Sequence, residues 1–235
     1  MREERVFIGP SRREWIFGLA YLFAHVFFLQ SMILEILFLL ISAFDIVVTD
    51  VLFNIIWFAI AFVVLVIFLW SYLRAGFARF LEYGLSNLTT LLAGYGIYLA
   101  LAFLLNRILF SILPELPSPN NDVVMEMAVL EFWPMFAVAV LLAPVVEEIF
   151  FRGVMFAPLR NVSRLLAYAV SSLAFGLWHV IQFLIFDFSP LLFVTALIYV
   201  PAGIALAWVY ERSGSIWTPI ALHAFINAVV FALMR

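Results

Sequence analysis

The sequence has no cysteine, no lysine and little charge of either sign, since only 11% of its 235 residues are charged. The absence of cysteine excludes disulfide bonds, thiolate nucleophiles and cysteine-ligated metals. A net charge of −3 without a long basic run argues against nucleic acid as a partner. Because so few charges cannot cover a water-exposed surface, an ordinary soluble domain is excluded as well.

The residues that are present favour an integral membrane protein. Hydrophobic side chains make up 67% of the chain, and its mean hydropathy is +1.18. The first apolar stretch, at 15–42, is about twice as long as a signal-peptide core, and no small-residue cleavage pattern follows it. We therefore expect a retained first span and a multi-pass protein of the cell membrane, surrounded by the lipid bilayer.

The predicted fold is an all-α, polytopic transmembrane bundle of about 7–8 helices. A spanning helix needs about 20 apolar residues, and polar residues divide the chain into seven stretches of about that length or more. The predicted spans are 15–42, 51–73, 87–112, 130–156, 165–186, 190–210 and 216–234. The first is long enough to tilt or to break near Gln30 and Ser31, which would add an eighth helix.

The chain is predicted to form a single membrane domain over residues 1–235. The N-terminal helices at 15–112 contain no recognisable motif, whereas the polar residues are concentrated at 130–234. The segment "LPELPSPNND" at 113–122 separates the two parts, and its prolines and asparagines predict an external loop.

The arginines predict how the bundle is oriented. Positive residues near helix ends stay in the cytoplasm, and ten of the twelve arginines lie in alternate loops or beside them: Arg2, Arg5, Arg12, Arg13, Arg74, Arg79, Arg152, Arg160, Arg164 and Arg212. Acidic residues predominate in the opposite loops. This pattern predicts seven spans with a cytoplasmic N-terminus.

Ionisable side chains inside the spans are candidate functional residues, because each costs about 2.5–3.5 kcal/mol to insert. Glu148 and Arg152 are four residues apart in the order that suits an ion pair along one helix. Glu147 is rotated by about 100° from Glu148 and projects from another face. It therefore needs partners from other helices, and His179 and His223 are the available imidazoles.

The residues around these histidines complete a predicted polar pocket. Asn227 lies four residues after His223 on the same helix face. Phe175 lies one turn before His179, where its ring can hold the imidazole. Such a set of groups can bind a water molecule, deprotonate it and stabilise an oxyanion. Pro144, which lacks a backbone N–H, is expected to free a carbonyl or to kink its helix.

Three short motifs resemble those of the CAAX-protease and bacteriocin-processing family of intramembrane endopeptidases, also called the Abi family. "EEIFFR" at 147–152 resembles its Glu-Glu-x-x-x-Arg motif, "FGLWH" at 175–179 its Phe-x-x-x-His motif and "HAFIN" at 223–227 its His-x-x-x-Asn motif. They occur in the family's order within residues 144–231. The first 125 residues match nothing beyond apolar helices.

The resemblance implies a role for each matching residue. Glu147 and His179 would activate the water molecule, and His223 and Asn227 would stabilise the oxyanion of the tetrahedral intermediate. Glu148, Arg152 and Phe175 would support the site. The expected activity is hydrolysis of a peptide bond at or within the membrane, with a peptide or a membrane protein as substrate.

The resemblance leaves open whether a metal takes part. Glu147, His179 and His223 could bind zinc with a fourth position open for water. However, the chain has no His-Glu-x-x-His helix, and no free carboxylate remains as a base once Glu147 is a ligand. A glutamate-type mechanism without a cofactor is therefore favoured over a zinc metalloprotease.

Two other functions are consistent with the same residues. Buried Glu, His and Arg also form proton relays in transporters, although inverted repeats and matching broken helices are not evident. A protease fold can also serve as an immunity or scaffold protein.

If the chain is an enzyme, the depths of Glu147 and His223 predict a site open to the cytoplasm. His25 matches no motif and is interpreted as structural or as lining a crevice. The sequence does not predict an oligomeric state.

Overall fold

The computed structural model describes residues 7–44 and 48–234, and all regular elements in these ranges are helical. Three π-helical segments interrupt the α-helices. The elements are α1 Arg12–Ala24, η1 His25–Leu29, α2 Gln30–Phe44, α3 Asp50–Phe68, α4 Trp70–Glu82, α5 Gly84–Ile112, α6 Pro119–Leu130, α7 Phe132–Phe136, η2 Ala137–Leu142, α8 Ala143–Glu148, η3 Ile149–Phe156, α9 Ala157–Arg160, α10 Arg164–Trp178, α11 Ile181–Phe186, α12 Leu191–Leu197, α13 Val200–Ser213 and α14 Trp217–Leu233.

The predicted all-α bundle is confirmed. Within the described ranges, five helical stretches are long and apolar enough to cross a membrane: Arg12–Ile41, Asp50–Phe68, Gly84–Ile112, Phe132–Arg160 and Leu191–Ser213. Two shorter apolar helices, Arg164–Trp178 and Trp217–Leu233, correspond to the other predicted spans.

Several predicted spans are interrupted in the structure, and the first and the fifth are described here because their interruptions lie beside the predicted pocket. The first stays continuous near Gln30 and Ser31, but η1 widens it just before Gln30. The fifth, predicted at 165–186, ends its helix at Trp178 and resumes at Ile181 as α11. His179 therefore lies at a helix end, where the chain changes direction beside the predicted pocket.

The prediction of a loop over 113–122 was wrong at its C-terminal end. Residues 113–118 are not helical, but α6 begins at Pro119. Proline suits the first turn of a helix because its missing N–H would have no helical partner there, and Asp122 in the same turn is favourable to the helix dipole. The polar composition thus marks a helix start as well as a loop.

Side chains at the helix ends explain several other boundaries. Ser11 and Glu14 form a capping box that begins α1, and Thr49 and Ser163 cap α3 and α10 through their hydroxyl groups. Each hydroxyl accepts a backbone N–H that would otherwise lack a partner. Gly214 ends α13 at a φ of 68°, a left-handed conformation that glycine adopts without strain.

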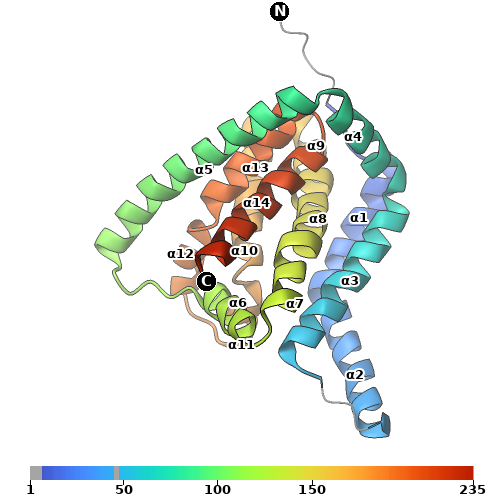
Figure 1. Ribbon diagram of the computed structural model, residues 1–235, viewed down its shortest axis with the longest axis vertical. Helices are drawn as coiled ribbons and strands as arrows, with labels where there is room; N and C mark the ends of the chain where they lie inside the picture. The colour runs from blue at the N-terminus through green and yellow to red at the C-terminus, as the bar shows by residue number, and fades with distance from the viewer. Residues whose placement is uncertain (1–6, 45–47, 235) are drawn as a thin grey trace, which may run out of the picture.

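The helices form a core flanked by two arms (Figure 1). α13 packs against α5, α10 and α14, and α14 also contacts α5, α8 and η2. The long helix α5 lies along one side of the core, while α1, α2 and α3 form the other side. α1 reaches the core by packing on η3, and α3 by packing on α8. The fourth span, α7 to α9, is therefore enclosed by protein.

Prolines in the fourth span leave carbonyls that side chains of other helices satisfy. In the π-helical register, the residue that would bond to the Ala139 oxygen is Pro144, which has no N–H. Asn227 Nδ2 donates to that oxygen at 2.7 Å. Pro158 likewise has no N–H for the Val154 oxygen, and Trp15 Nε1 donates there at 2.9 Å. The prediction that Pro144 frees a carbonyl fits this arrangement, since buried carbonyls need such partners.

Candidate active site

Glu147 lies where three helices meet, on α8 and 6% exposed. Its Oε2 atom is 4.0 Å from His179 Nε2 at the end of α10 and 3.9 Å from His223 Nε2 on α14. The prediction that Glu147 faces the two imidazoles rather than a partner on its own helix is confirmed. Both distances exceed a direct hydrogen bond.

The ring of His179 is fixed by contacts on both faces and at one nitrogen. Its Nδ1 atom is 2.8 Å from the Phe175 carbonyl oxygen, which can only accept, so Nδ1 carries a proton. The Phe175 ring lies 4.8 Å away between centroids, as predicted, and Tyr199 stacks on the imidazole at 4.1 Å and 12°. Nε2 is therefore the nitrogen that faces Glu147.

The ring of His223 is held by Glu148. Its Nδ1 atom lies 2.9 Å from Glu148 Oε1, so this nitrogen donates and Nε2 is again left for Glu147. Glu148 also forms the predicted ion pair with Arg152, whose Nε atom lies 3.0 Å from Glu148 Oε2. Both side chains of that pair are fully buried. The sequence analysis missed the contact to His223, which makes Glu148 a support for a candidate catalytic histidine.

Arg152 connects this buried network to two further helices. Its Nη2 atom donates to the Gly203 carbonyl on α13 at 3.2 Å, and its guanidinium carbon lies 4.9 Å from the centre of the Phe175 ring. Gly203 also lets α13 pack closely against α10, because a Cβ atom there would lie 2.8 Å from Ser172 Cα. The predicted supporting residues thus pack together beneath Glu147.

Asn227 lies on the same wall as His223, as the spacing predicted, and both line one cavity. Its amide group already donates to the Ala139 oxygen. The side chain therefore holds α14 against η2, and one N–H of its amide remains for another acceptor.

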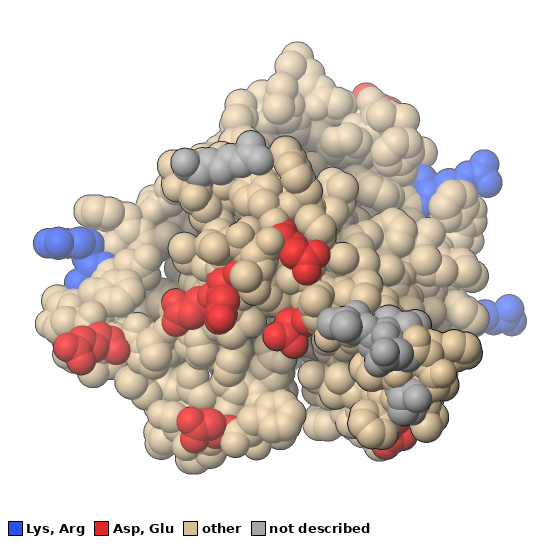
Figure 2. Space-filling model, turned by 60° about the horizontal axis from the view of Figure 1, so that its bottom comes forward, with Lys and Arg blue, Asp and Glu red and all other residues tan. Residues whose placement is uncertain are grey.

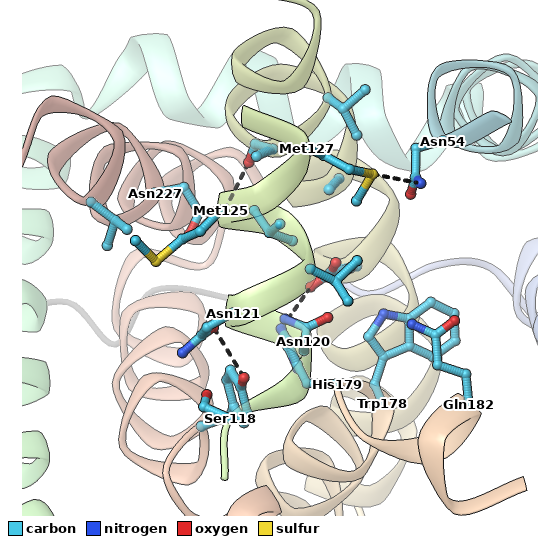
Figure 3. A pocket seen from close by; sticks show the side chains of 18 of the residues that line it. Asn54, Ser118, Asn120, Asn121, Met125, Met127, Trp178, His179, Gln182 and Asn227 are labelled. Atoms are coloured by element: carbon cyan, nitrogen blue, oxygen red, sulfur yellow. Dashed lines mark hydrogen bonds and ion pairs between the residues drawn. The ribbon is translucent and has the colours of Figure 1, made fainter. Parts of the chain in front are cut away.

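The cavity in front of Glu147 has a volume of about 730 Å³ (Figure 3). Helix α6 lines one part of it, and Figure 3 shows Asn120 and Asn121 of α6 among the lining side chains. Asn121 Oδ1 accepts a hydrogen bond from Tyr199, whose ring stacks on His179. The cavity reaches exposed residues such as Asp50 and Met125 at the acidic end of the bundle. The sequence analysis predicted, from the depths of Glu147 and His223, that the site opens at the arginine-rich end. The structure differs, because none of the described arginines of that end lines the cavity.

His25 also lines this cavity, as one of its two sequence interpretations expected. Its side chain is 1% exposed, and its ring centre lies 4.0 Å from Trp57 and 5.5 Å from Trp178. The Nε2 atom has no hydrogen-bond partner among the described residues. The N-terminal part of the chain thus contributes one buried imidazole beside the predicted site.

The arrangement of the carboxylates bears on whether the site can bind a catalytic metal ion. Among the described residues, no group of three His, Asp or Glu side chains is arranged to hold a metal ion. Glu148 is engaged by both Arg152 and His223, so it is not a free base that could serve a zinc ion bound by Glu147. The donor set does not fit a catalytic zinc site with its own base.

Comparisons with known proteins identify the segment that contains this geometry. Residues 129–229 match the family described as type II CAAX prenyl endopeptidase Rce1-like. The match covers less than half of the chain, and residues 129–229 are called the Rce1-like segment below. A 97-residue stretch is 33% identical to the Bacillus subtilis (strain 168) protein named "Putative membrane peptidase YdiL", and it covers 41% of this chain and 35% of that protein. No solved structure matches the chain.

The Rce1-like segment contains Glu147, His179, His223 and Asn227 together with their supports. The family match and the five apolar helices show that the chain is a multi-pass integral membrane protein. Tyr199 lies within the segment but was missed by sequence reasoning, because no spacing rule links it to His179. His25 and α6 lie outside the segment except for the last residues of α6. The cavity is therefore built from both parts of the chain.

Proposed function

We propose that the chain is a membrane-embedded endopeptidase in which Glu147 and His179 activate a water molecule for attack on a peptide bond. The observation that supports this most directly is the meeting of two imidazole Nε2 atoms with Glu147 Oε2, at 4.0 and 3.9 Å, inside a cavity. A water molecule that bonds to Glu147 and to one imidazole would fit distances of this size.

The proton positions give this cluster its chemistry. Because both Nδ1 atoms donate, to the Phe175 carbonyl and to Glu148, both neutral rings present Nε2 lone pairs to Glu147. One shared proton then relieves the repulsion among these three acceptors. A site that holds one mobile proton can accept a proton from water and later return it.

The proposed reaction has two steps. Water attacks the carbonyl carbon while its proton passes to the Glu147–His179 pair, and the oxygen of the tetrahedral intermediate accepts hydrogen bonds from protonated His223 Nε2 and from the Asn227 amide. The carbon–nitrogen bond then breaks as the pair returns the proton to the leaving amine. Glu148 supports the role of His223 as a donor to this oxygen, because its carboxylate stabilises the charged imidazole.

The decisive experiment compares the peptides that accumulate in cells expressing the wild type or Glu147→Gln, a variant that keeps the side-chain shape. Glu82→Gln is the matched control, since Glu82 is an exposed residue on α4. We expect specific peptides to appear with the wild type and with the control and to be lost with Glu147→Gln and with His179→Phe. If correctly folded Glu147→Gln yields the same peptides, the proposed function is wrong.

We favour a glutamate-type mechanism over a zinc metalloprotease. The support is the engagement of Glu148 by Arg152 and His223, which leaves no second base beside a zinc-bound Glu147. Cleavage by the purified protein should persist after chelation with EDTA and dialysis. Loss of cleavage that is restored by zinc alone would establish the metalloprotease instead.

The arginine pattern supports a cytoplasmic N-terminus, and in this orientation the cavity opens on the non-cytoplasmic side. The natural lack of cysteine permits a direct test with two single-cysteine variants. In intact cells, an impermeant maleimide should label Glu115→Cys, near the start of α6, and spare Glu82→Cys, at the end of α4, until the membrane is opened. The reverse labelling would invert the orientation.

A further inference from the structure

Among the residues that the structure describes, no arginine lines the cavity, although all 12 basic residues of the chain are arginines. Glu147 and Asp50 supply its two carboxylates, and Asp50 is exposed where the cavity meets the surface. Four of its lining residues have a buried polar atom without a hydrogen-bond partner among the described residues: Glu147 Oε2, His25 Nε2, Asn106 Oδ1 and Ser118 Oγ. The cavity therefore contains polar atoms whose hydrogen-bonding capacity is not used by the described residues.

Carboxamides are the commonest polar groups on its walls. Besides Asn227, they are Gln30, Asn54, Asn106, Asn120, Asn121 and Gln182. Each carboxamide can donate and accept hydrogen bonds, which is what an extended peptide main chain requires once it has lost its helical bonds in an apolar environment. Asn106 Oδ1 is buried without a hydrogen-bond partner in the part of the chain that the structure describes. These walls suit an uncharged, extended stretch of peptide.

One acidic side chain lines the mouth of the cavity, and two more lie next to it on α6. We define the acidic rim as Asp50 with Asp122 and Glu126 of α6. All three are exposed. Asp50 lines the cavity, and Asp122 and Glu126 are next in sequence to the lining residues Asn121, Val123 and Met125. On the face shown in Figure 2, acidic side chains gather over the middle and the visible arginines lie at the edges.

The two ends of the bundle differ in whether their carboxylates are paired with arginine. At the opposite end, Glu211 is paired with both Arg160 and Arg164. At the rim, none of the three carboxylates pairs with an arginine in the described ranges, and exposed Arg107 on α5 does not line the cavity. Carboxylates left unpaired around one mouth produce a negative potential there that attracts cations.

We propose that the substrate is a cationic peptide, with a lysine or arginine that contacts the acidic rim and an uncharged, extended stretch that lies among the carboxamides beside Glu147. This inference rests on the proposed function and adds the class of substrate. Like charges at the rim disfavour acidic segments, so the rim selects by repulsion as well as by attraction.

The test uses three labelled synthetic peptides that share one uncharged apolar sequence and differ only in flanking Arg-Arg, Gln-Gln or Glu-Glu pairs. Their binding to the full-length Glu147→Gln protein, which is expected not to cleave them, is measured by fluorescence anisotropy in an uncharged detergent. We expect the Arg-Arg peptide to bind most tightly and the Glu-Glu peptide most weakly. Raising the salt concentration should reduce the difference.

Substitutions at the rim localise the effect. In the same Glu147→Gln background, Asp50→Asn, Asp122→Asn and Glu126→Gln together should weaken binding of the Arg-Arg peptide by about tenfold, as expected for a few exposed ion pairs. The Gln-Gln peptide should be unaffected. Glu82→Gln, which removes an exposed acid far from the rim, should change nothing. Equal binding of the Arg-Arg and Gln-Gln peptides, or a charge preference that survives in the triple variant, would overturn the inference.

Cleavage of the same peptides by the wild type is measured separately. Cleavage of all three at equal rates, together with equal binding, refutes the cationic substrate and leaves the peptidase assignment intact. Charge-selective binding without cleavage of any of the three contradicts the proposed function and leaves the cationic binding site intact. The two ideas therefore fail in different assays.

Discussion

The N-terminal helices and the Rce1-like segment differ in how much of their apolar surface is buried by protein. In the apolar windows of the first three spans only 17%, 17% and 11% of residues are buried by protein, against 67% in Phe132–Arg160 and 50% in Leu191–Ser213. Lipid therefore surrounds the first group, and protein surrounds the second. Ionisable groups accumulate where protein can satisfy them.

This difference explains why the two parts carry different chemistry. The Rce1-like segment buries Glu147, Glu148, Arg152 and His223 together, whereas the most buried ionisable group in the N-terminal helices is the isolated His25. A lipid-facing helix needs only to be apolar, so many sequences suffice. An enclosed polar network requires specific side chains at specific helical angles, which is why motifs occur in one part of the chain only.

The largest effect should come from Arg152→Met. Removing this cation leaves Glu148 buried without its charge partner, which costs about 3–5 kcal/mol. The matched control in the N-terminal helices is Arg107→Met, where an exposed charge is lost and the effect should stay within about 0.5 kcal/mol. Unfolding in mixed detergent micelles measures both. Equal stability of the two variants would contradict the view that the Rce1-like segment depends on enclosed charge.

A smaller loss is expected from Gly203→Ala. The added Cβ would meet Ser172 at 2.8 Å from Cα and 2.9 Å from Cβ, and overpacking of this kind costs about 1–3 kcal/mol. Gly96→Ala on α5 is the control, since nothing lies within 4 Å of a Cβ there. It should stabilise the helix by up to about 1 kcal/mol. Thermal melting should move in opposite directions, and parallel shifts would show that both glycines serve only as flexible points.

Asn227→Ala should cost about 1–2 kcal/mol, because the Ala139 carbonyl loses its donor. Asn87→Ala is the counterpart in α5, where the amide of Asn87 donates to the Phe80 carbonyl at 2.9 Å. The two losses of stability should be similar, but only Asn227→Ala should also lower the rate of cleavage. If both variants retain full activity, Asn227 serves only to hold α14 in place.

Helix periodicity predicted the pairs within one helix and showed that Glu147 needs partners from other helices, but other contacts between helices were missed. Glu148 with Arg152, and Phe175 with His179, lie one turn apart, so a single helix determines their contact. The bond from His223 to Glu148 and the stacking of Tyr199 on His179 depend on how separate helices rotate against one another. The side on which the cavity opens depends on packing of the whole bundle, and depth along one helix does not determine it.

The smallest effect is expected from His25→Phe, and it sharpens the comparison between the two parts of the chain. A phenylalanine keeps the ring between Trp57 and Trp178 and removes a buried Nε2 atom that has no hydrogen-bond partner among the described residues. Replacing such a group by an apolar one of similar shape is close to neutral or slightly stabilising. His179→Phe makes the same chemical change in the Rce1-like segment and should abolish cleavage. Melting temperature and cleavage rate measured for both variants separate the outcomes. If His25→Phe also abolishes cleavage while the protein stays folded, an N-terminal helix supplies part of the reaction chemistry, and the division between a lipid-facing support and an enclosed catalytic part does not hold.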